Sequence, residues 1–77
     1  MIGVQEFAYS AEKLIDSSVK QLVVQTEGWK EDWKIKEVVF TGTDGGSTWI
    51  CFTVKIEIPK EDRKYFENEI GGTIIEA

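Results

Sequence analysis

One stretch of the sequence indicates the fold: TWICFTVKIEI, residues 48–58. Within this stretch every even-numbered residue from Ile50 to Ile58 is apolar, whereas the odd-numbered positions are mostly polar. Because successive side chains of a strand point to opposite faces, this period of two predicts a half-buried β-strand. The odd-numbered face nevertheless begins with Trp49 and Cys51, so one end of the face expected to meet water is apolar. Such a patch needs a cover from the rest of the chain or a partner.

A β-hairpin over residues 33–58 follows from the sequence that precedes this strand. Residues 33–41 are rich in β-branched and aromatic side chains, and residues 42–47, GTDGGS, have the composition of a turn. Asp44-Gly45 is a strong signal for a two-residue hairpin loop, because both positions tolerate positive φ. The sequence therefore predicts two antiparallel strands joined at Asp44-Gly45.

A two-residue loop also predicts which residues pair across the hairpin. One face of the paired strands is expected to be the core, interrupted only by Glu37, and the opposite face is expected to begin with an apolar group. The core pairs are Val39 with Ile50, Glu37 with Phe52, Ile35 with Val54 and Trp33 with Ile56; the opposite pairs are Phe40 with Trp49, Val38 with Cys51, Lys36 with Thr53 and Lys34 with Lys55.

The N-terminal third of the chain is predicted to contain an amphipathic helix. Apolar residues recur at spacings of three and four between Val4 and Val23, which places them in one stripe of a helix. The helix is predicted over residues 11–25, and its start has two interpretations. Ser10 is a good N-cap, which leaves residues 2–9 free to form a strand, whereas the unbroken periodicity extends the same helix back to Val4.

The residues after the hairpin predict a short helix and allow a last strand. Pro59 ends the long strand, and the acidic residues that follow are typical of a helix start, so a short helix is expected over residues 60–69. Residues 73–75 allow a short strand. With strands at both termini the order is β-α-β-β-α-β, as in ferredoxin-like folds. The predicted class is α+β, with the amphipathic N-terminal helix packed on an antiparallel sheet built around residues 33–58.

Composition limits the size, compartment and partners of the protein. A chain of 77 residues is expected to form a single domain, 1–77, whose small core would gain stability from self-association or a partner. A net charge of −5 argues against direct binding to nucleic acid. The single cysteine fits a reducing compartment, and neither a secretory signal nor a membrane-spanning run is visible, so a cytoplasmic protein without membrane contact is expected.

The sequence offers no set of residues for catalysis. It contains no histidine, which removes the commonest general base and the commonest metal ligand. Cys51 lies inside a strand without a group to activate it, so we interpret it as a packing residue. The carboxylates of Glu61-Asp62, Glu67 and Glu69 are interpreted as a solvated helix face. Neither an enzyme activity nor a cofactor or metal site is predicted.

The function predicted from these observations is that of a protein-interaction module, in the form of a small acidic regulator or inhibitor. Its partner is either another protein or a second copy in a homo-oligomer, and tryptophan is a residue that often dominates interfaces. The residues expected to make the contact are Val38, Phe40, Trp49 and Cys51 at the apolar centre, Trp29 in the preceding loop, and Glu31, Asp32 and Asp44 at the rim. Residues 60–77 provide an alternative cover for Trp49 within the chain itself.

The order of a strand, a helix opening at Ser10, Trp33 and the Asp44-Gly45 turn also resembles the dodecins, small β-α-β-β proteins that bind flavin as dodecamers. The resemblance implies an oligomer in which an aromatic residue of the second strand, Trp33 here, stacks on the flavin ring. The chain departs from that family by continuing well past Ile58, by lacking a Gly-Thr-Ser before the helix, and by carrying an extra Trp29. A binder of a planar ligand is therefore the alternative function.

Overall fold

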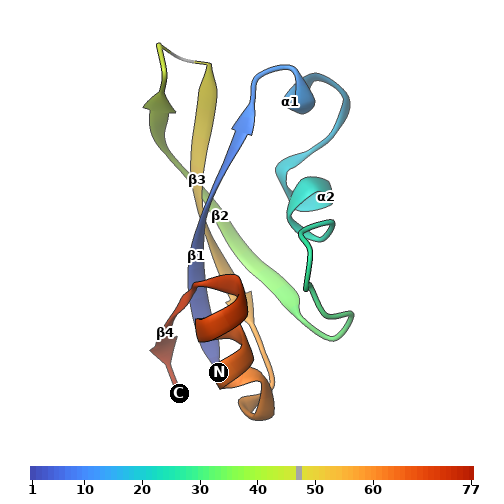
Figure 1. Cartoon of the computed structure of the whole chain (residues 1–77), viewed down its shortest axis with the longest axis vertical. Coiled ribbons are helices and arrows are strands. Elements are labelled where there is room, and N and C mark those ends of the chain that lie inside the picture. The colour runs from blue at the N-terminus through green and yellow to red at the C-terminus, as the bar shows by residue number, and fades with distance from the viewer. Residues whose placement is uncertain (47) are drawn as a thin grey trace.

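A four-stranded antiparallel sheet forms the body of the protein in the computed structural model, which describes residues 1–46 and 48–77. Strands account for 43% of the chain, so the fold is mainly β. The strand order is β2-β3-β1-β4, which places the N-terminal strand in the interior of the sheet (Figure 1). The strands are β1 (Ile2–Ser10), β2 (Lys34–Asp44), β3 (Trp49–Glu57) and β4 (Thr73–Glu76).

The helical segments are short and lie in two places. Between β1 and β2 the chain makes two separate turns, α1 (Lys13–Asp16) and α2 (Val19–Val23). After β3 it forms one continuous segment, made of η1 (Lys60–Asp62), α3 (Arg63–Tyr65) and η2 (Phe66–Ile70). This second segment lies where a short C-terminal helix was predicted, and it ends at Gly71, whose φ of 85° is left-handed.

The predicted α+β fold with an amphipathic N-terminal helix packed on the sheet is wrong. Residues 2–10 form a strand, and residues 11–25 hold only the four residues of α1 and the five of α2. Ile15, which the helical stripe would bury, is 79% exposed. The strand order would suit a ferredoxin-like arrangement, but the two short turns between β1 and β2 are not the packed helix that such a fold requires.

Two features explain why the N-terminal residues do not form one long helix. The residues of the helical stripe do not share one face of β1, since Val4 and Ala8 point to one side and Phe7 to the other. Pairing along the whole of β3 stabilises the strand in place of a helix. Ser18 then interrupts residues 11–25 because its backbone is extended, with φ −75° and ψ 161°. Its hydroxyl accepts a hydrogen bond from the Gln21 backbone N–H, and the Gln21 side chain accepts one from the Ser18 N–H. This capping box starts a new helix at Val19.

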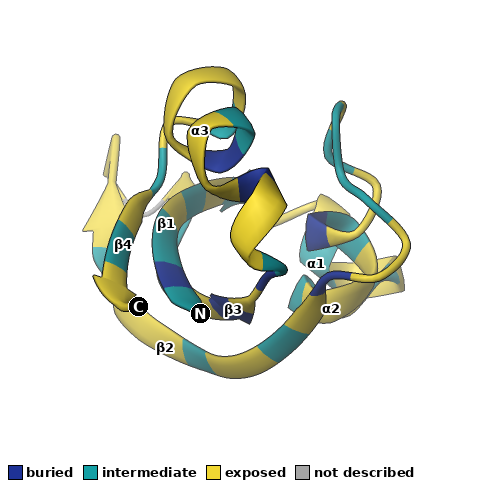
Figure 2. Cartoon of the chain, turned by 90° about the horizontal axis from the view of Figure 1, so that it is seen from below, coloured by how far each residue is buried: buried dark blue, intermediate teal, exposed yellow. Residues whose placement is uncertain are grey.

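The sheet has one buried face, here called the inner face and defined by Val54 and Ile56, which are fully buried. Seen from below, the strands follow a curve whose open side is closed by the helical segments (Figure 2). The tight packing against this face involves Phe66, because a Cβ atom added at Gly3 or at Gly72 would overlap its ring. The buried core consists of Val23, Trp33, Val54, Ile56, Ile58 and Phe66.

The hairpin over residues 33–58 is present, but its predicted register is wrong. The loop has four residues instead of the predicted two, and Asp44 and Trp49 face each other across the strands at its ends. One of those four, Ser47 of the predicted turn, lies outside the described residues. Bulges between Ile35 and Glu37, and between Phe40 and Gly42, shift the pairing twice more. As a result Val38 faces Val54 and Phe40 faces Phe52, both on the inner face.

Candidate protein-interaction surface

The second face of the sheet carries an exposed group of apolar residues near the β2–β3 turn. This outer face bears the odd-numbered residues of β3, because the even-numbered Val54 and Ile56 point into the core. Cys51 lies opposite Ala8 of β1, and Thr53 lies opposite Val39 of β2. Directly opposed residues share a face, so apolar side chains from three strands meet here. We call the group Ala8, Val39, Trp49 and Cys51 the outer patch.

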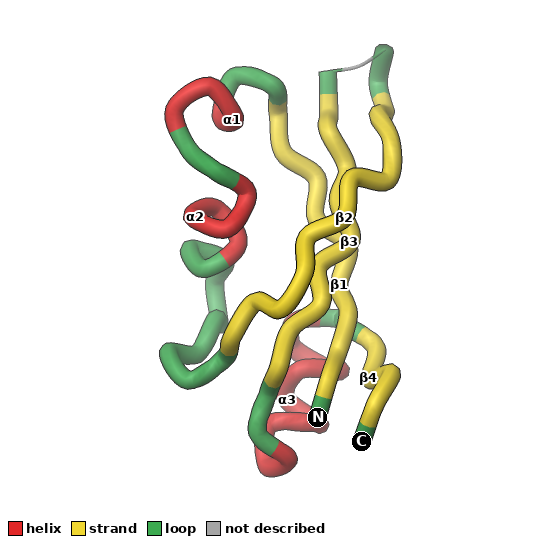
Figure 3. The backbone as a smooth tube through the Cα atoms, turned by 180° about the vertical axis from the view of Figure 1, so that it is seen from behind, coloured by secondary structure: helices red, strands yellow, loops and turns green. Residues whose placement is uncertain are grey.

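The outer patch is not covered by the rest of the described chain. Trp49 is 46% exposed and Val39 is 44% exposed. In Figure 3 the strands lie in front of α3, and α1 and α2 stand to one side of them, so no helix lies over the side of the sheet that faces the viewer. The C-terminal strand pairs with β1 only at Ile2–Val4, whereas Trp49 lies beside Ser10 at the other end of β1. The alternative that residues 60–77 cover Trp49 is therefore wrong.

The four residues predicted to form one apolar centre are divided between the two faces of the sheet. Trp49 and Cys51 lie on the outer face, but Val38 and Phe40 lie on the inner face opposite Val54 and Phe52. Val38 packs against the core, whereas Phe40 is 59% exposed and contacts the edge of the Phe52 ring at 6.1 Å between centroids. Sequence reasoning missed Val39 because the two bulges and the longer loop were not recognised. It missed Ala8 because the pairing of β1 with β3 was not predicted.

The remaining residues predicted to contact a partner lie in two different places. Trp29 precedes β2 and packs edge-on against the buried Trp33, with ring centroids 5.2 Å apart, so it is partly buried and distant from the outer patch along β2. Glu31 and Asp32 are exposed in the same connection. Only Asp44 of the predicted acidic rim borders the outer patch, because it lies directly opposite Trp49.

Charged side chains occupy the other end of the outer face. The Nζ atom of Lys55 lies 3.7 Å from Oε1 of Glu37, and Nζ of Lys36 lies 3.6 Å from Oε1 of Glu57. Each of these four side chains is about half exposed, so the ion pairs add little stability. Their effect is to divide the outer face into an apolar end at the turn and a charged end near the start of β2.

A buried polar group lies beneath the opposite end of the sheet. Asp62 is 7% exposed and accepts hydrogen bonds from Trp33 Nε1 at 2.9 Å and from Lys30 Nζ at 3.0 Å. The indole donor, followed by the lysine, holds the pKa of the Asp62 carboxyl below its ordinary value. The hydrogen bond between Lys30 and Asp62 is also the main reason that the pKa of Lys30 is raised. Lys30 also lies 4.4 Å above the ring of Tyr65.

The interpretation of Glu61-Asp62 as part of a solvated helix face is wrong for Asp62. Its carboxylate turns inward because Trp33 is almost fully buried and its N–H needs an acceptor. The sequence signal that was available is a tryptophan predicted for the core, which requires a polar partner from another segment. We interpret this cluster as a structural link between the β2 connection and the C-terminal helical segment.

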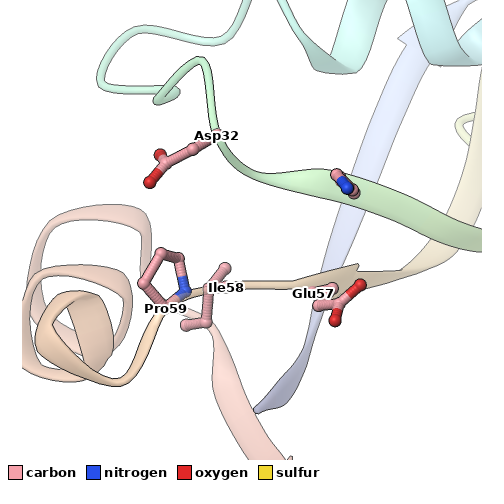
Figure 4. A pocket seen from close by; sticks show the side chains of 5 residues that line it. Asp32, Glu57, Ile58 and Pro59 are labelled. Atoms are coloured by element: carbon pink, nitrogen blue, oxygen red, sulfur yellow. The ribbon is translucent and has the colours of Figure 1, made fainter.

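The hollows in the surface of the described residues are shallow and open. The hollow in Figure 4 has a volume of about 220 Å³ and is lined at the start of β2 and the end of β3 by Asp32, Lys34, Glu57, Ile58 and Pro59. Ligand pockets commonly enclose roughly 300–1,000 Å³ with apolar walls. Two other open hollows, of about 310 and 400 Å³, are lined largely by polar residues. The described residues hold no group of three or more side chains placed to bind a metal ion.

Trp33, the residue that the dodecin resemblance places on a flavin ring, is 4% exposed. Its ring is in edge contact with the rings of Trp29, Tyr65 and Phe66. Comparison with protein-family models, curated proteins and solved structures finds no match to the chain. Within the described ranges, none of the helices combines the length and the apolar character needed to cross a membrane.

Proposed function

We propose that this protein is a non-catalytic interaction module that binds another protein through the outer patch. The observation that carries the proposal is a large aromatic side chain, Trp49, left 46% exposed on a sheet face that has no helical cover and that also bears the half-exposed Val39. Exposed apolar groups that span several strands are typical of binding surfaces. A non-catalytic role is also in keeping with a chain that contains no histidine.

The charges around the outer patch support a partner of a particular kind. Asp44 lies opposite Trp49, and Glu6 lies opposite Thr53 on the outer face. The protein as a whole carries a net charge of −5. We therefore propose a partner with an apolar pocket for the Trp49 ring and basic side chains at its edge, because complementary charge guides association and selects the partner.

Capture of the partner followed by binding measurements with purified proteins tests the proposal. Trp49→Asp should weaken binding by about 30-fold or more, since a buried tryptophan at an interface commonly contributes at least about 2 kcal/mol. Ile75→Asp is the matched control, because Ile75 is 47% exposed on β4, outside the outer patch. Equal binding by Trp49→Asp and by the unchanged protein, with both folded by circular dichroism, would rule the proposal out.

The alternative, a dodecin-like binder of a planar ligand, has less support from the geometry. It requires a free face of Trp33, and that ring is buried among other aromatic residues. Titration with flavin while tryptophan fluorescence is recorded separates the two functions. Saturable quenching would favour the ligand binder. Unchanged fluorescence at high flavin concentration would exclude the ligand binder and leave the protein-interaction module as the remaining proposal.

A further inference from the structure

The outer side of strand β2 offers a second binding feature, which shares Val39 with the outer patch but does not involve Trp49. β2 is an edge of the sheet, so one side of its backbone has no strand beside it among the described residues. It is also the longest strand, with 11 residues, whereas the opposite edge, β4, has four. An exposed edge presents unpaired N–H and C=O groups that can pair with another strand. The backbone of β2 is therefore available for sheet extension.

The side chains along this edge are apolar at its centre. The regular pairing with β3 between the two bulges covers Glu37–Phe40. Within it Val39 is 44% exposed on the outer face and Phe40 is 59% exposed on the inner face. Each face of the sheet thus has one exposed apolar side chain at this edge, at adjacent positions of β2. An added strand would cover both side chains.

The charges of β2 indicate which strand can pair with its free edge and in which direction that strand runs. Lys34, Lys36 and Glu37 precede the apolar residues Val38–Phe40, and Asp44 follows them. An antiparallel copy of the same strand places the lysines of one chain beside Asp44 of the other, whereas a parallel copy places lysine beside lysine. Opposite charges across paired strands are favourable and like charges are unfavourable. The edge is therefore complementary to itself in the antiparallel direction.

We propose that the protein forms a two-fold symmetric dimer by antiparallel pairing of β2 with β2 of a second copy, centred on Val39. In this arrangement Val39 faces Val39 of the partner chain on the outer face, and Phe40 faces Val38 of the partner chain on the inner face. The exposed part of each Phe40 ring is buried, and the two sheets join into one. A closed two-fold contact uses the same residues from both copies and stops at the dimer.

Sedimentation equilibrium of the full chain and two variants tests the interface. The unchanged protein is expected to be a dimer, and Phe40→Lys is expected to weaken dimerisation about tenfold or more because it places a charge where an apolar side chain is buried. Ile75→Lys, a change at a residue of β4 that is 47% exposed, is expected to remain dimeric. The proposal is overturned if the unchanged protein is monomeric throughout, or if Phe40→Lys remains as dimeric as Ile75→Lys.

Cross-linking tests the register and does not depend on whether Phe40→Lys folds. In a Cys51→Ser background, Val39→Cys places one thiol of each chain on the two-fold axis. Opposed Cα atoms in antiparallel strands lie about 4.5–5.5 Å apart, within reach of a disulfide. Thr41→Cys is the control, because that position faces Glu37 of the partner chain. Rapid covalent dimer from Val39→Cys alone supports the register, and equal rates from the two variants overturn it.

The dimer and the proposed function can fail separately. Trp49 lies on β3, away from the β2 edge, so Trp49→Asp is expected to weaken partner binding and leave the dimer intact. Phe40 lies on the inner face, so Phe40→Lys is expected to separate the copies without changing the outer patch of each. Measuring both properties for both variants therefore assigns each surface its own role.

Discussion

The indole N–H of Trp33 donates a hydrogen bond of 2.9 Å to Oδ2 of Asp62, across 29 positions of the sequence. This bond joins the connection before β2 to the helical segment after β3. The second carboxylate oxygen accepts a hydrogen bond of 3.0 Å from Lys30, so both oxygens of a nearly buried group are paired. A buried carboxylate is stable when it is paired in this way, and removing one of its donors would be costly because a buried charge would be left without a partner.

The first prediction concerns acid. The pKa of Asp62 is below its ordinary value of 3.8 in the folded protein, so the unfolded chain takes up a proton more readily. The stability that this carboxylate adds is therefore fully present at pH values above 3.8 and is lost as the pH falls through its lower folded pKa. Urea unfolding at a series of pH values from neutral to below 3.8 should show this loss.

The matched variants for the acid prediction are Asp62→Asn and Asp32→Asn. Asp62→Asn should be less stable at neutral pH and should lose less stability over the same acid range, because its side chain does not titrate. Asp32→Asn changes an exposed carboxylate and should follow the unchanged protein. If the curves for Asp62→Asn and the unchanged protein run parallel, Asp62 does not control the acid response.

The second prediction compares two tyrosines that differ in their hydroxyl partners. The Tyr9 hydroxyl is buried without a hydrogen-bond partner in the described residues, although Thr26 lies near enough to offset part of the rise that burial causes in the Tyr9 pKa. The Tyr65 hydroxyl donates to the Gly28 carbonyl at 2.8 Å. Tyr9→Phe should therefore raise the free energy of unfolding by up to about 1 kcal/mol, and Tyr65→Phe should lower it by about 1 kcal/mol.

Urea denaturation of the two tyrosine variants checks this comparison. The opposite signs are the diagnostic result, since each change removes one oxygen atom from an otherwise unchanged ring. A loss of stability in both variants would mean that the Tyr9 hydroxyl has a partner in solution, such as the side chain of Thr26.

The third prediction concerns the contact between Gly3 and Phe66. A Cβ atom at position 3 would overlap the fully buried ring, which has no room to move away. Gly3→Ala should therefore destabilise the protein by about 1–3 kcal/mol, the usual cost of overpacking. The penalty should shrink in a Phe66→Leu background, and a double-mutant cycle measures this coupling. Additive effects of the two changes would show that Gly3 is not needed to admit the ring.

The fourth prediction concerns the capping box at the start of α2. Ser18→Ala removes the acceptor for the Gln21 N–H and should cost about 1 kcal/mol of unfolding free energy, as N-cap substitutions commonly do. Ser17→Ala changes the preceding hydroxyl, which is not the N-cap, and is expected to have a smaller effect. Thermal unfolding of both variants provides the comparison, and equal effects would argue against a capping role for Ser18.

The alternating pattern predicted the hairpin strands and the two faces of β3 correctly, because one residue parity maps directly onto one face. It could not predict the register, since each bulge in β2 inserts a residue that the pattern does not mark. The outer position of Trp49 and Cys51 followed from β3 alone and needed no register. The residues of β2 that lie beside Trp49 and Cys51 depend on the length of the turn. The two-residue loop therefore predicts Val38 and Phe40 on the outer face, whereas Val39 lies there in the structure.

The N-terminal residues show a different limit of sequence reasoning. Val4, Phe7 and Ala8 fit a helical stripe but not an alternating strand, because Val4 and Ala8 lie on the outer face of β1 and Phe7 lies on the inner face, so local spacing favours the wrong element. The choice depends on pairing with β3, which lies far along the chain. The capping box from Ser18 to Gln21 was a readable signal for a break in the predicted helix. The burial of Asp62 was not readable, because it depends on where Trp33 lies in three dimensions.

The position of β1 inside the sheet has a consequence for how the chain folds. Its two neighbours, β3 and β4, both come much later in the sequence, whereas β2 and β3 are joined by a short turn. Contacts between distant segments form slowly because a long loop must close first. We expect the β2–β3 hairpin to form early and β1 to be added afterwards. During synthesis, a nine-residue strand therefore remains without its partner until β3 has been made.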